Sequence, residues 1–397
     1  MSHFFEVIMG TYVIINVYMF VRLWVTLAGC GLLRGFVCGV FALFALSFPA
    51  GRLLAYFLPV PLIDAITMMG SLYISPMIYG FLLTVIADIF RLINGVVAIT
   101  HNPPPFSTGV RLSCVSAIFG MSVIITLAGM WNADTPVVVT HDIAIDAFQQ
   151  TEGGDTPFKI AALSDVHLGQ LTGPRYLKKL VNAVNEQFPD IVLLLGDTVD
   201  SDYFFRDEDI VNEAAELLSS FNSRLGTWAI LGNHDYYAGA DRVEKFLSRS
   251  EVAVLTDEAV NVDGEIMLVG RVDRAASRYG VKRLDIADIV SLSAPDGASI
   301  ARLMVIMDHQ PFDLDESMNY GADLQLSGHT HRGQIFPFNF IIASIYEKSY
   351  GLYKKGSTNY YISSGAGVWG SPVRTVGRPE IVIINVDNTS NGGYDGQ

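Results

Sequence analysis

The sequence predicts an N-terminal all-α transmembrane region of about four helices, joined to an α/β domain. The first observation behind this fold class is charge. Residues 1–131 hold five Lys or Arg and three Asp or Glu, whereas the rest of the chain holds 21 basic and 37 acidic residues, a net charge of −16. The second is pattern, because short apolar runs alternate with amphipathic stretches only after residue 132. We therefore expect a domain boundary near residue 132 and a connecting segment, 132–157, that carries the first strand.

Four stretches within residues 1–131 are apolar and long enough to cross a bilayer, which takes roughly 20 residues. They are Val7–Thr26, Gly35–Leu58, Ala65–Ala87 and Leu112–Trp131. A cleavable signal peptide would explain only the first of them. We therefore expect a multi-pass integral protein of the inner or plasma membrane. Asp88 and Arg91 share one helix face, and we interpret them as anchors at headgroup level, with a functional intramembrane pair as the alternative.

The basic residues of the membrane region predict its orientation, since Lys and Arg favour short cytoplasmic connections. Arg22, Arg34, Arg91 and Arg111 flank the first and third connections, whereas the second carries only Arg52. With four spans, the N-terminus and the acidic domain are then expected outside the cytoplasm. One helix more or fewer would reverse this orientation, and Asp88–Val97 could be either an interfacial helix or part of the third span.

Composition also excludes two kinds of site from the acidic part of the chain. All three cysteines, Cys30, Cys38 and Cys114, lie in the apolar part, so the acidic part has neither a disulfide nor a cysteine-based zinc site. The charge of −16 argues against an extended nucleic-acid surface, and no nucleic-acid partner is expected.

The acidic part carries short apolar runs typical of strands and amphipathic stretches typical of helices. The strand-like runs are Val137–Val139 with Ile143–Ile145, Ile160–Leu163, Ile191–Leu195, Trp228–Leu231, Ile266–Val269, Leu303–Met307, Leu324–Leu326 and Tyr360–Ile362. The helical stretches are Pro174–Phe188, Asp209–Phe221 and Asp241–Leu247. This alternation predicts a largely buried sheet. The polar tail, residues 387–397, is rich in Gly and Asn and is expected to be disordered.

Five of the eight histidines come directly after these apolar runs. The runs lead into Asp165-Val166-His167, Gly196-Asp197, Gly232-Asn233-His234-Asp235, Asp308-His309 and Gly328-His329-Thr330-His331. Ligands of open α/β sheets bind at the carboxyl ends of the strands. One such histidine alone would be an ordinary turn residue, but five of them beside Asp, Asn or Gly predict a metal site.

The donor types and their spacing indicate which metals could bind. Imidazole and carboxylate donors suit Zn, Mn, Fe or Ni. Asp165 and His167 are two residues apart, as are His329 and His331, so each pair could point the same way in an extended segment. A carboxylate such as Asp197 can bridge two metals, and a metal pair clamps the attacking and leaving oxygens of an in-line displacement.

The five motifs resemble the calcineurin-like metallophosphoesterase superfamily, whose pattern is D-x-H, G-D-x-x-D, G-N-H-D/E, a lone H and G-H-x-H. All five occur in this order between Asp165 and His331. The resemblance implies a metallophosphoesterase domain over residues 158–386, built as a two-sheet β-sandwich flanked by helices. With the apolar region before it, the chain is similar to the transmembrane metallophosphoesterase subgroup. A metal-dependent phosphoric ester hydrolase is therefore expected.

The resemblance also implies roles for single residues around two divalent ions, which would be Mn, Zn, Fe or Mg, with Mn favoured. One metal would be held by Asp165, His167, Asp197 and His331, and the second by Asp197, Asn233, His309 and His329. The nucleophile would be a metal-bridging hydroxide. His234 would face the phosphate, steadying its charge or protonating the leaving oxygen, and Asp235 would orient His234. Asp200, in the second motif, is expected to be a structural hydrogen-bonding residue.

Two arginines are candidate substrate contacts. The subgroup often reads G-H-T-H-G-G-Q-I, whereas this chain has Arg332 at the fifth position. Its guanidinium could grip a phosphate with two hydrogen bonds, or point to solvent and pair with an acid. Arg374 ends a glycine-rich stretch, Ser363–Arg374, that also resembles the subgroup. It could contact substrate or belong to a purely structural loop.

The sequence thus favours a membrane-anchored hydrolase of phosphodiesters, phosphomonoesters or pyrophosphates. The anchor would hold the site near the bilayer, which favours lipid-linked substrates. The alternative is a catalytically silent metal-binding sensor or scaffold domain, against which the full ligand set and His234 argue. A transporter is disfavoured because the membrane region is short and poor in polar residues. The expected partners are the lipid bilayer and a phosphate ester, and the oligomeric state stays open.

Overall fold

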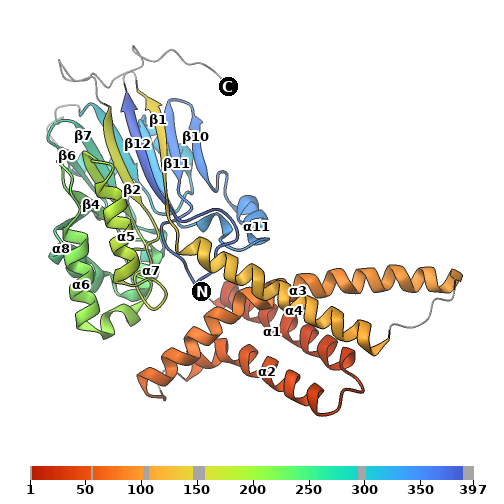
Figure 1. Ribbon diagram of the computed structural model, residues 1–397. Helices are drawn as coiled ribbons and strands as arrows, with labels where there is room; N and C mark the ends of the chain where they lie inside the picture. The colour runs from red at the N-terminus through yellow and green to blue at the C-terminus, as the bar shows by residue number, and fades with distance from the viewer. Residues whose placement is uncertain (1, 55–56, 102–106, 146–156, 294–300, 388–397) are drawn as a thin grey trace. The chain divides into compact units, whose positions relative to one another are not determined.

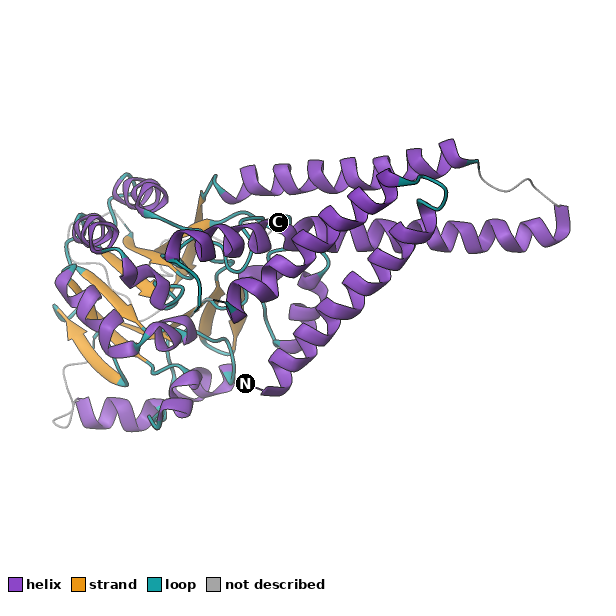
Figure 2. Cartoon of the chain, turned by 90° about the horizontal axis from the view of Figure 1, so that it is seen from below, coloured by secondary structure: helices purple, strands orange, loops and turns teal. Residues whose placement is uncertain are grey.

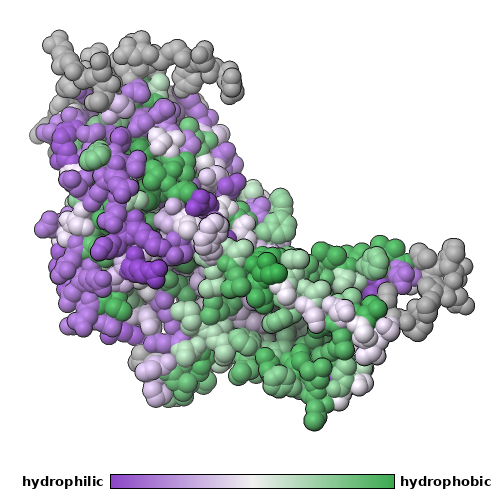
Figure 3. Space-filling model, viewed as in Figure 1, coloured by the Kyte–Doolittle hydropathy of each residue, from purple (hydrophilic) through white to green (hydrophobic). Residues whose placement is uncertain are grey.

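The computed structural model describes residues 2–54, 57–101, 107–145, 157–293 and 301–387, and the chain divides into two compact units. The helical unit comprises residues 1–131 together with Gly370–Val373, and the α/β unit comprises residues 132–369 and 374–397. On the face shown in Figure 3, hydrophobic residues dominate the helical unit and hydrophilic residues dominate the α/β unit. The change in composition near residue 132 therefore coincides with a change in architecture.

The helical unit contains helices without strands (Figure 2). These are α1 (Ser2–Thr26), α2 (Leu32–Leu53), α3 (Val60–His101) and α4 (Thr108–Ala133). Each includes a stretch long and apolar enough to span a membrane, namely Glu6–Thr26, Leu32–Gly51, Pro61–Gly95 and Thr108–Ala133. Helix α3 continues without a break beyond Ala87, so Asp88–Val97 is part of the third helix, one of the two alternatives that the sequence left open.

Polar side chains within the helical unit pair across helices. The Tyr73 hydroxyl of α3 donates to Asn16 of α1 over 2.6 Å. Asp88 of α3 accepts hydrogen bonds from Tyr18 over 2.6 Å and from Arg22 over 2.5 Å, both of α1, and lies 3.5 Å from Arg91. Asp88 therefore connects two helices in addition to pairing with its neighbour Arg91.

Two six-stranded sheets form the frame of the α/β unit (Figure 1). The first has the order β1-β12-β2-β3-β4-β5 and the second the order β10-β11-β9-β8-β7-β6. The strands are β1 (Val137–Ala144), β2 (Phe158–Leu163), β3 (Ile191–Leu195), β4 (Thr227–Ile230), β5 (Val252–Val254), β6 (Glu258–Val262), β7 (Ile266–Gly270), β8 (Leu303–Met307), β9 (Leu324–Ser327), β10 (Gly351–Lys355), β11 (Thr358–Ile362) and β12 (Glu380–Asp387). Strands β2 to β5 are mutually parallel, as are β7, β8, β9 and β11. The carboxyl ends of each parallel set therefore share one edge of their sheet.

Helices flank both sheets, and α11 lies apart from them beside η3. The helices of this unit are α5 (Pro174–Asn185), α6 (Glu208–Ser219), α7 (Asn233–Ala238), α8 (Ala240–Arg249), α9 (Ile286–Ser293), α10 (Leu314–Tyr320) and α11 (Phe338–Ile345), with short 3-10 turns η1 (Asp202–Arg206), η2 (Arg274–Tyr279) and η3 (His331–Gly333). Along β2, Ile160 and Ala162 join the core between the sheets, whereas Ala161 and Leu163 pack with α5, α6 and α8. This alternation follows from the two-residue period of a strand. The expected two-sheet sandwich flanked by helices is confirmed.

The predicted strands and the observed ones differ at the edges of the sheets. All eight strand-like runs lie in strands, but β5, β6, β10 and β12 have no counterpart in the sequence interpretation. Strand β12 extends through Asp387, so the tail predicted to be disordered begins inside a strand. Residues 388–397 of that tail, and residues 146–156 of the connecting segment, lie outside the described residues.

Candidate metal centre

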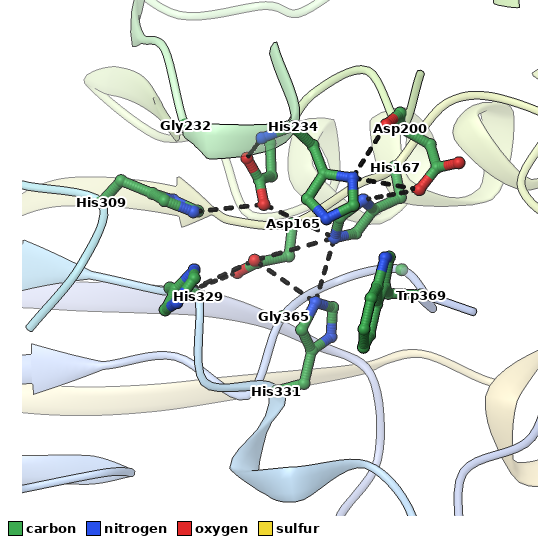
Figure 4. A network of polar contacts seen from close by, with 12 residues as sticks. Asp165, His167, Asp200, Gly232, His234, His309, His329, His331, Gly365 and Trp369 are labelled. Carbon is green, nitrogen blue, oxygen red and sulfur yellow. Dashed lines mark hydrogen bonds and ion pairs between the residues drawn. The ribbon is translucent and has the colours of Figure 1, made fainter. Parts of the chain in front are cut away.

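The ends of five strands bring the candidate ligands together (Figure 4). Strand β2 leads into Asp165 and His167, β3 into Asp197, β4 into Asn233, β8 into His309, and β9 into His329 and His331. Within each sheet these strands are parallel neighbours, so their side chains are delivered to a common edge. Residues separated by up to 166 positions in the chain thus lie within contact distance.

Asp165, His167 and His331 form the first group of candidate ligands. Each offers a ligand atom within 4.8 Å of those of the other two. His331 Nε2 lies 3.0 Å from His167 Nε2 and 3.4 Å from Asp165 Oδ1. Two imidazole nitrogens and a carboxylate oxygen therefore face one point inside the protein, and all three side chains are buried.

Asp197, His309 and His329 form the second group, also with ligand atoms within 4.8 Å of one another. Asp197 Oδ2 lies 3.2 Å from His309 Nε2 and 3.8 Å from His167 Nε2 of the first group. Asp197 is therefore placed between the two groups. The buried Oδ1 of Asn233 has no hydrogen-bond partner among the described residues. A buried oxygen without a hydrogen-bond partner lowers the stability of the fold by about 1–3 kcal/mol. A metal ion would give this oxygen a partner, and the oxygen and imidazole donors around it suit divalent metals.

Two glycines allow the strand ends to approach so closely. A Cβ on Gly232 would lie 2.2 Å from Asp197 Oδ1, and a Cβ on Gly328 would lie 2.4 Å from Asp165 Oδ2. Any other residue at either position would displace a candidate ligand. The glycines of the G-N-H-D and G-H-x-H motifs are therefore explained by space beside the carboxylates.

The backbone of the candidate ligands is left-handed at five positions. The φ angles are 56° at Asp165, 53° at His167, 51° at Asp197, 67° at His329 and 47° at His331. This conformation is uncommon outside glycine, and strained residues of this kind cluster at functional sites. The expectation of extended segments is therefore wrong. The ligands of each D-x-H or H-x-H pair converge through this left-handed backbone rather than through the alternation of an extended strand.

Burial and neighbouring charges set the protonation of the candidate ligands. Burial lowers the pKa of His329 to about 3. It also lowers the pKa of His331, with the neighbouring His167 and Arg374 as further causes. Burial alone would lower the pKa of His309 as well, but the adjacent Asp197 carboxylate outweighs it and raises that pKa. A metal ligand must be a neutral imidazole, and the surroundings of His329 and His331 favour that form.

His234 contacts Asp200, whereas the sequence interpretation paired it with Asp235. His234 Nδ1 lies 2.8 Å from the Asp200 carbonyl oxygen and 3.4 Å from its carboxylate, which is also 3.3 Å from His167 Nδ1. Burial would lower the pKa of His234, but Asp197 and Asp200 outweigh it and raise that pKa to about 9. Asp200, expected to be only structural, thus joins a candidate ligand to the candidate phosphate-facing residue.

Asp235 has a different role in the structure from the one expected. Its carboxylate accepts backbone N–H groups of Gly232 and Val199, each over 2.8 Å, and of Thr198 over 3.3 Å. It is the third residue of α7, and it caps the start of this helix by accepting the N–H of Gly232, the residue before the first turn. Adjacent residues of a helix point about 100° apart, so Asp235 turns away from its neighbour His234.

We expect Asp200→Asn to lower kcat/KM about 10- to 100-fold, the usual effect of removing a carboxylate that supports a ligand histidine. The carboxylate fixes the rings of both His167 and His234, so metal affinity and turnover should fall together. Metal titration and steady-state kinetics of the full chain measure both. The matched control is Asp202→Asn, an exposed carboxylate two residues away, which should leave both unchanged. An Asp200→Asn protein with native metal affinity would contradict the shared role.

Arg374 is fully buried, so the expected direct contact with substrate is not supported. Its Nη2 donates to the carbonyl oxygens of Ser364 over 2.5 Å and Gly367 over 3.0 Å, and lies 3.1 Å from His331 Nδ1. The guanidinium therefore holds the glycine-rich loop against the back of a candidate ligand. Of the two alternatives, the geometry favours a structural role for Arg374 and its loop over a contact with substrate.

Replacing Arg374 with methionine, which keeps much of the side-chain volume, should destabilise the α/β unit by about 3 kcal/mol, because two buried carbonyls lose their donor. Thermal unfolding of the detergent-solubilised full chain should show this loss as a fall of roughly 6–10 °C. The KM for a phosphate ester should stay within about twofold, since the side chain contributes no binding energy to substrate. A large rise in KM without loss of stability would restore Arg374 as a substrate contact.

Arg332 and Trp369 lie on the outside of the centre. The Arg332 guanidinium packs over the Tyr350 ring, 4.1 Å from its centroid, a cation–π contact that the sequence did not predict. The Trp369 ring lies 5.8 Å from that of His234 and is nearly half exposed. Trp369 was missed as a candidate site residue, although it stands in the glycine-rich loop that the sequence interpretation singled out.

A two-sheet α/β fold with buried His and Asp groups at its strand ends is that of a metallohydrolase. The calcineurin-like phosphoesterase family profile matches residues 158–333. An uncharacterized metallophosphoesterase of Campylobacter jejuni is 32% identical over 325 residues, which cover 80% of each chain. An uncharacterized metallophosphoesterase of Aquifex aeolicus is 30% identical over 59% of this chain and 87% of its own.

A vertebrate relative has both parts of the architecture in its name. The transmembrane protein with metallophosphoesterase domain of Danio rerio is 30% identical over 66% of this chain and 60% of its own. This chain belongs to the calcineurin-like metallophosphoesterase family, and it is a metal-dependent phosphoesterase. Together with the four apolar helices, these relatives identify it as a membrane protein.

Proposed function

We propose that this chain is a membrane-anchored phosphoesterase that uses two divalent metal ions, with Mn favoured, to hydrolyse lipid-linked phosphate esters. One observation carries the proposal above the others: Asp197 lies between two buried groups of candidate ligands, within 3.2 Å of His309 and 3.8 Å of His167. A shared carboxylate between two groups of imidazoles is the arrangement that a two-metal site needs.

The proposed ligands of the two metals follow from these groups. Asp165, His167, Asp197 and His331 would hold one metal, and Asp197, Asn233, His309 and His329 the other. When bound, the metal pair would supply an activated nucleophile near neutral pH and stabilise charge on the reacting oxygens. Because the ligands are mostly buried, water is largely excluded, and each such electrostatic interaction is stronger than it would be in water.

His234 is the proposed phosphate-facing residue. Its backbone N–H donates to Asp197 Oδ1 over 2.7 Å, and its ring packs edge-on against His167. These contacts fix the imidazole beside both groups of ligands without placing it in either proposed ligand set. From that position it would steady the charge of the phosphate or protonate the leaving oxygen.

The lipid-linked substrate and the side of the membrane are part of the proposal. The anchor supports a substrate in the bilayer because the catalytic unit begins where α4 ends, at residues 132–133. The clustering of Arg22, Arg34, Arg91 and Arg111 around the first and third connections supports a catalytic unit outside the cytoplasm. A tag at the C-terminus of the full chain should then be accessible from the extracytoplasmic side of intact cells, and protection there would reverse the orientation.

The substrate class is tested with the purified full chain. Hydrolysis of phosphomonoesters, phosphodiesters, lipid pyrophosphates and cyclic nucleotides is compared in Mn, Zn and Mg. We expect Mn-stimulated cleavage, with lipid-linked esters preferred to soluble ones of the same bond type. Turnover of no phosphate ester by a protein that binds both metals would instead indicate the catalytically silent domain.

A further inference from the structure

Helix α11 is an apolar helix without a buried face in the α/β unit. None of its eight residues is buried, and Phe340, Ile341 and Ile345 are each more than half exposed. The segment from Phe336 to Tyr346 contains no charged residue. Water-soluble surfaces seldom expose so many large apolar side chains together, and such patches mark interaction sites.

The α11 segment begins directly at the metal centre. His331 is separated from Phe336 by four residues, and a Cβ on Gly333 would lie 2.4 Å from the backbone nitrogen of Asn339. Gln334 is hydrogen bonded in both directions to the backbone of Trp369, over 3.0 Å each. The α11 segment and the Trp369 ring are therefore held by the same turn that carries a candidate ligand.

The base of α11 is also linked to Asn132 within the α/β unit. Asn132, next to Ala133 at the C-terminal end of α4, donates to the carbonyl oxygens of Arg374 over 3.1 Å and Gly377 over 2.7 Å. Between these two residues, Thr375 accepts the N–H of Phe336 over 2.9 Å. Trp131, which precedes Asn132, is largely exposed, and tryptophan is enriched where a membrane helix reaches the headgroups.

We infer that α11 and Phe336 insert into the bilayer surface and hold the metal centre at headgroup level. We call the exposed apolar side chains of this region the apolar rim; they are Phe336, Phe338, Phe340, Ile341, Ile345 and Trp369. An apolar helix at a membrane surface sinks about 5–10 Å into the boundary between headgroups and acyl chains. The occupant is the lipid bilayer because the chain carries four helices long and apolar enough to span a membrane, and the base of α11 is linked to Asn132, where the chain leaves the last of them.

This placement narrows the substrate of the proposed function. A phosphate ester at the headgroup of a membrane lipid would lie level with His234 and Trp369, whereas its acyl chains would remain among the side chains of the rim. The consequence for substrate rests on the proposed phosphoesterase function. The contact between α11 and lipid does not, so the two are tested separately.

Lipid contact is tested by fluorescence quenching with the full chain. Cys30, Cys38 and Cys114 are replaced by serine, Phe340→Cys is labelled with an environment-sensitive fluorophore, and the protein is reconstituted into phosphatidylcholine vesicles with or without nitroxide-labelled acyl chains. The matched control is Leu292→Cys on α9, which is 70% exposed against 65% for Phe340. We expect several-fold stronger quenching at position 340 than at position 292. Equal quenching at the two positions would overturn the inference. A label at position 340 that is blue-shifted but not quenched would also overturn it, because the label would then be buried against a second copy or another protein.

The preference for a lipid-linked substrate is tested with two aryl phosphodiesters that share the same leaving group. Hexadecyl p-nitrophenyl phosphate is presented in vesicles and methyl p-nitrophenyl phosphate in solution. Introducing Phe340→Asp and Ile341→Asp together should lower hydrolysis of the hexadecyl ester about tenfold or more, because two charges now oppose insertion, and leave the methyl ester unchanged. Leu292→Asp should change neither. Equal loss for both esters would mean that α11 has a structural role and would overturn the consequence for substrate. If the native chain hydrolyses neither ester, the proposed function is contradicted. The lipid contact is then still decided by the quenching experiment.

Discussion

Asp197→Ala should abolish metal-stimulated hydrolysis of a generic aryl phosphodiester, with a fall in kcat/KM of roughly 10³-fold or more. Asp197 is the one candidate ligand placed between both groups, so its loss should weaken both metal sites. Elemental analysis of the purified full chain should show fewer than two metal ions per protein. The same protein gives both the rate and the metal content.

Two further variants separate this effect from misfolding. Asp197→Asn keeps the shape of the side chain and can still accept the N–H of His234, so it should fold while remaining inactive. Asp241→Ala removes an exposed carboxylate from the first turn of α8 and should retain full activity. Normal rates in folded Asp197→Ala protein with both metals bound would refute the proposed centre.

His234→Ala should lower kcat about 10²- to 10⁴-fold, the range for loss of a general acid, while both metals stay bound. His234 belongs to neither proposed ligand set, although its ring nitrogen comes within ligand distance of Asp197 and His167. Its two proposed roles differ in their dependence on the leaving group. If it protonates the leaving oxygen, the loss should be much larger for a benzyl ester than for a p-nitrophenyl ester, whose leaving group needs no proton.

Equal losses for the two esters would leave His234 as a residue that steadies the charge of the phosphate. Metal content distinguishes either role from ligation. If His234→Ala protein loses a metal as Asp197→Ala does, then His234 is a ligand and the proposed assignment of the centre is wrong.

Strands were predicted correctly where a continuous apolar run identifies the strand without knowledge of its neighbours in the sheet. Residues such as Ile191–Leu195 are buried on both faces and form an uninterrupted apolar run, which is why β3 was predicted with its observed bounds. Strand β5 has three residues and β10 has no buried ones, so neither leaves a clear pattern. Four long apolar helices were predicted for the same reason. The sequence left open whether residues 88–97 continue the third helix, because the ion pair between Asp88 and Arg22 of another helix is visible only in the structure.

The same distinction between local pattern and tertiary contact applies to the residues of the site. The order of the five motifs was enough to select the seven candidate ligands, since each follows a predictable strand. The supporting residues were not predictable in this way. Asp235 is adjacent to His234 in its motif, whereas Asp200 stands 34 residues earlier, at the end of the G-D-x-x-D motif. Only the tertiary structure shows that Asp235 turns to the backbone N–H groups while Asp200 reaches the His234 ring. Arg374 lies 140 residues after His234, and nothing in the sequence indicates that it is buried behind His331.

By itself, the sequence determined the two-part architecture and the α/β class and selected the candidate ligands, because these depend on local hydropathy and on motifs at strand ends. The tertiary structure decided how those residues converge. Strand pairing across two sheets places Asp197 between two groups of imidazoles, and left-handed turns at Asp165, His167, His329 and His331 aim the side chains inward. It also decided that α11 stays uncovered beside the centre. Such features depend on contacts between distant segments, and no local pattern of residues encodes them.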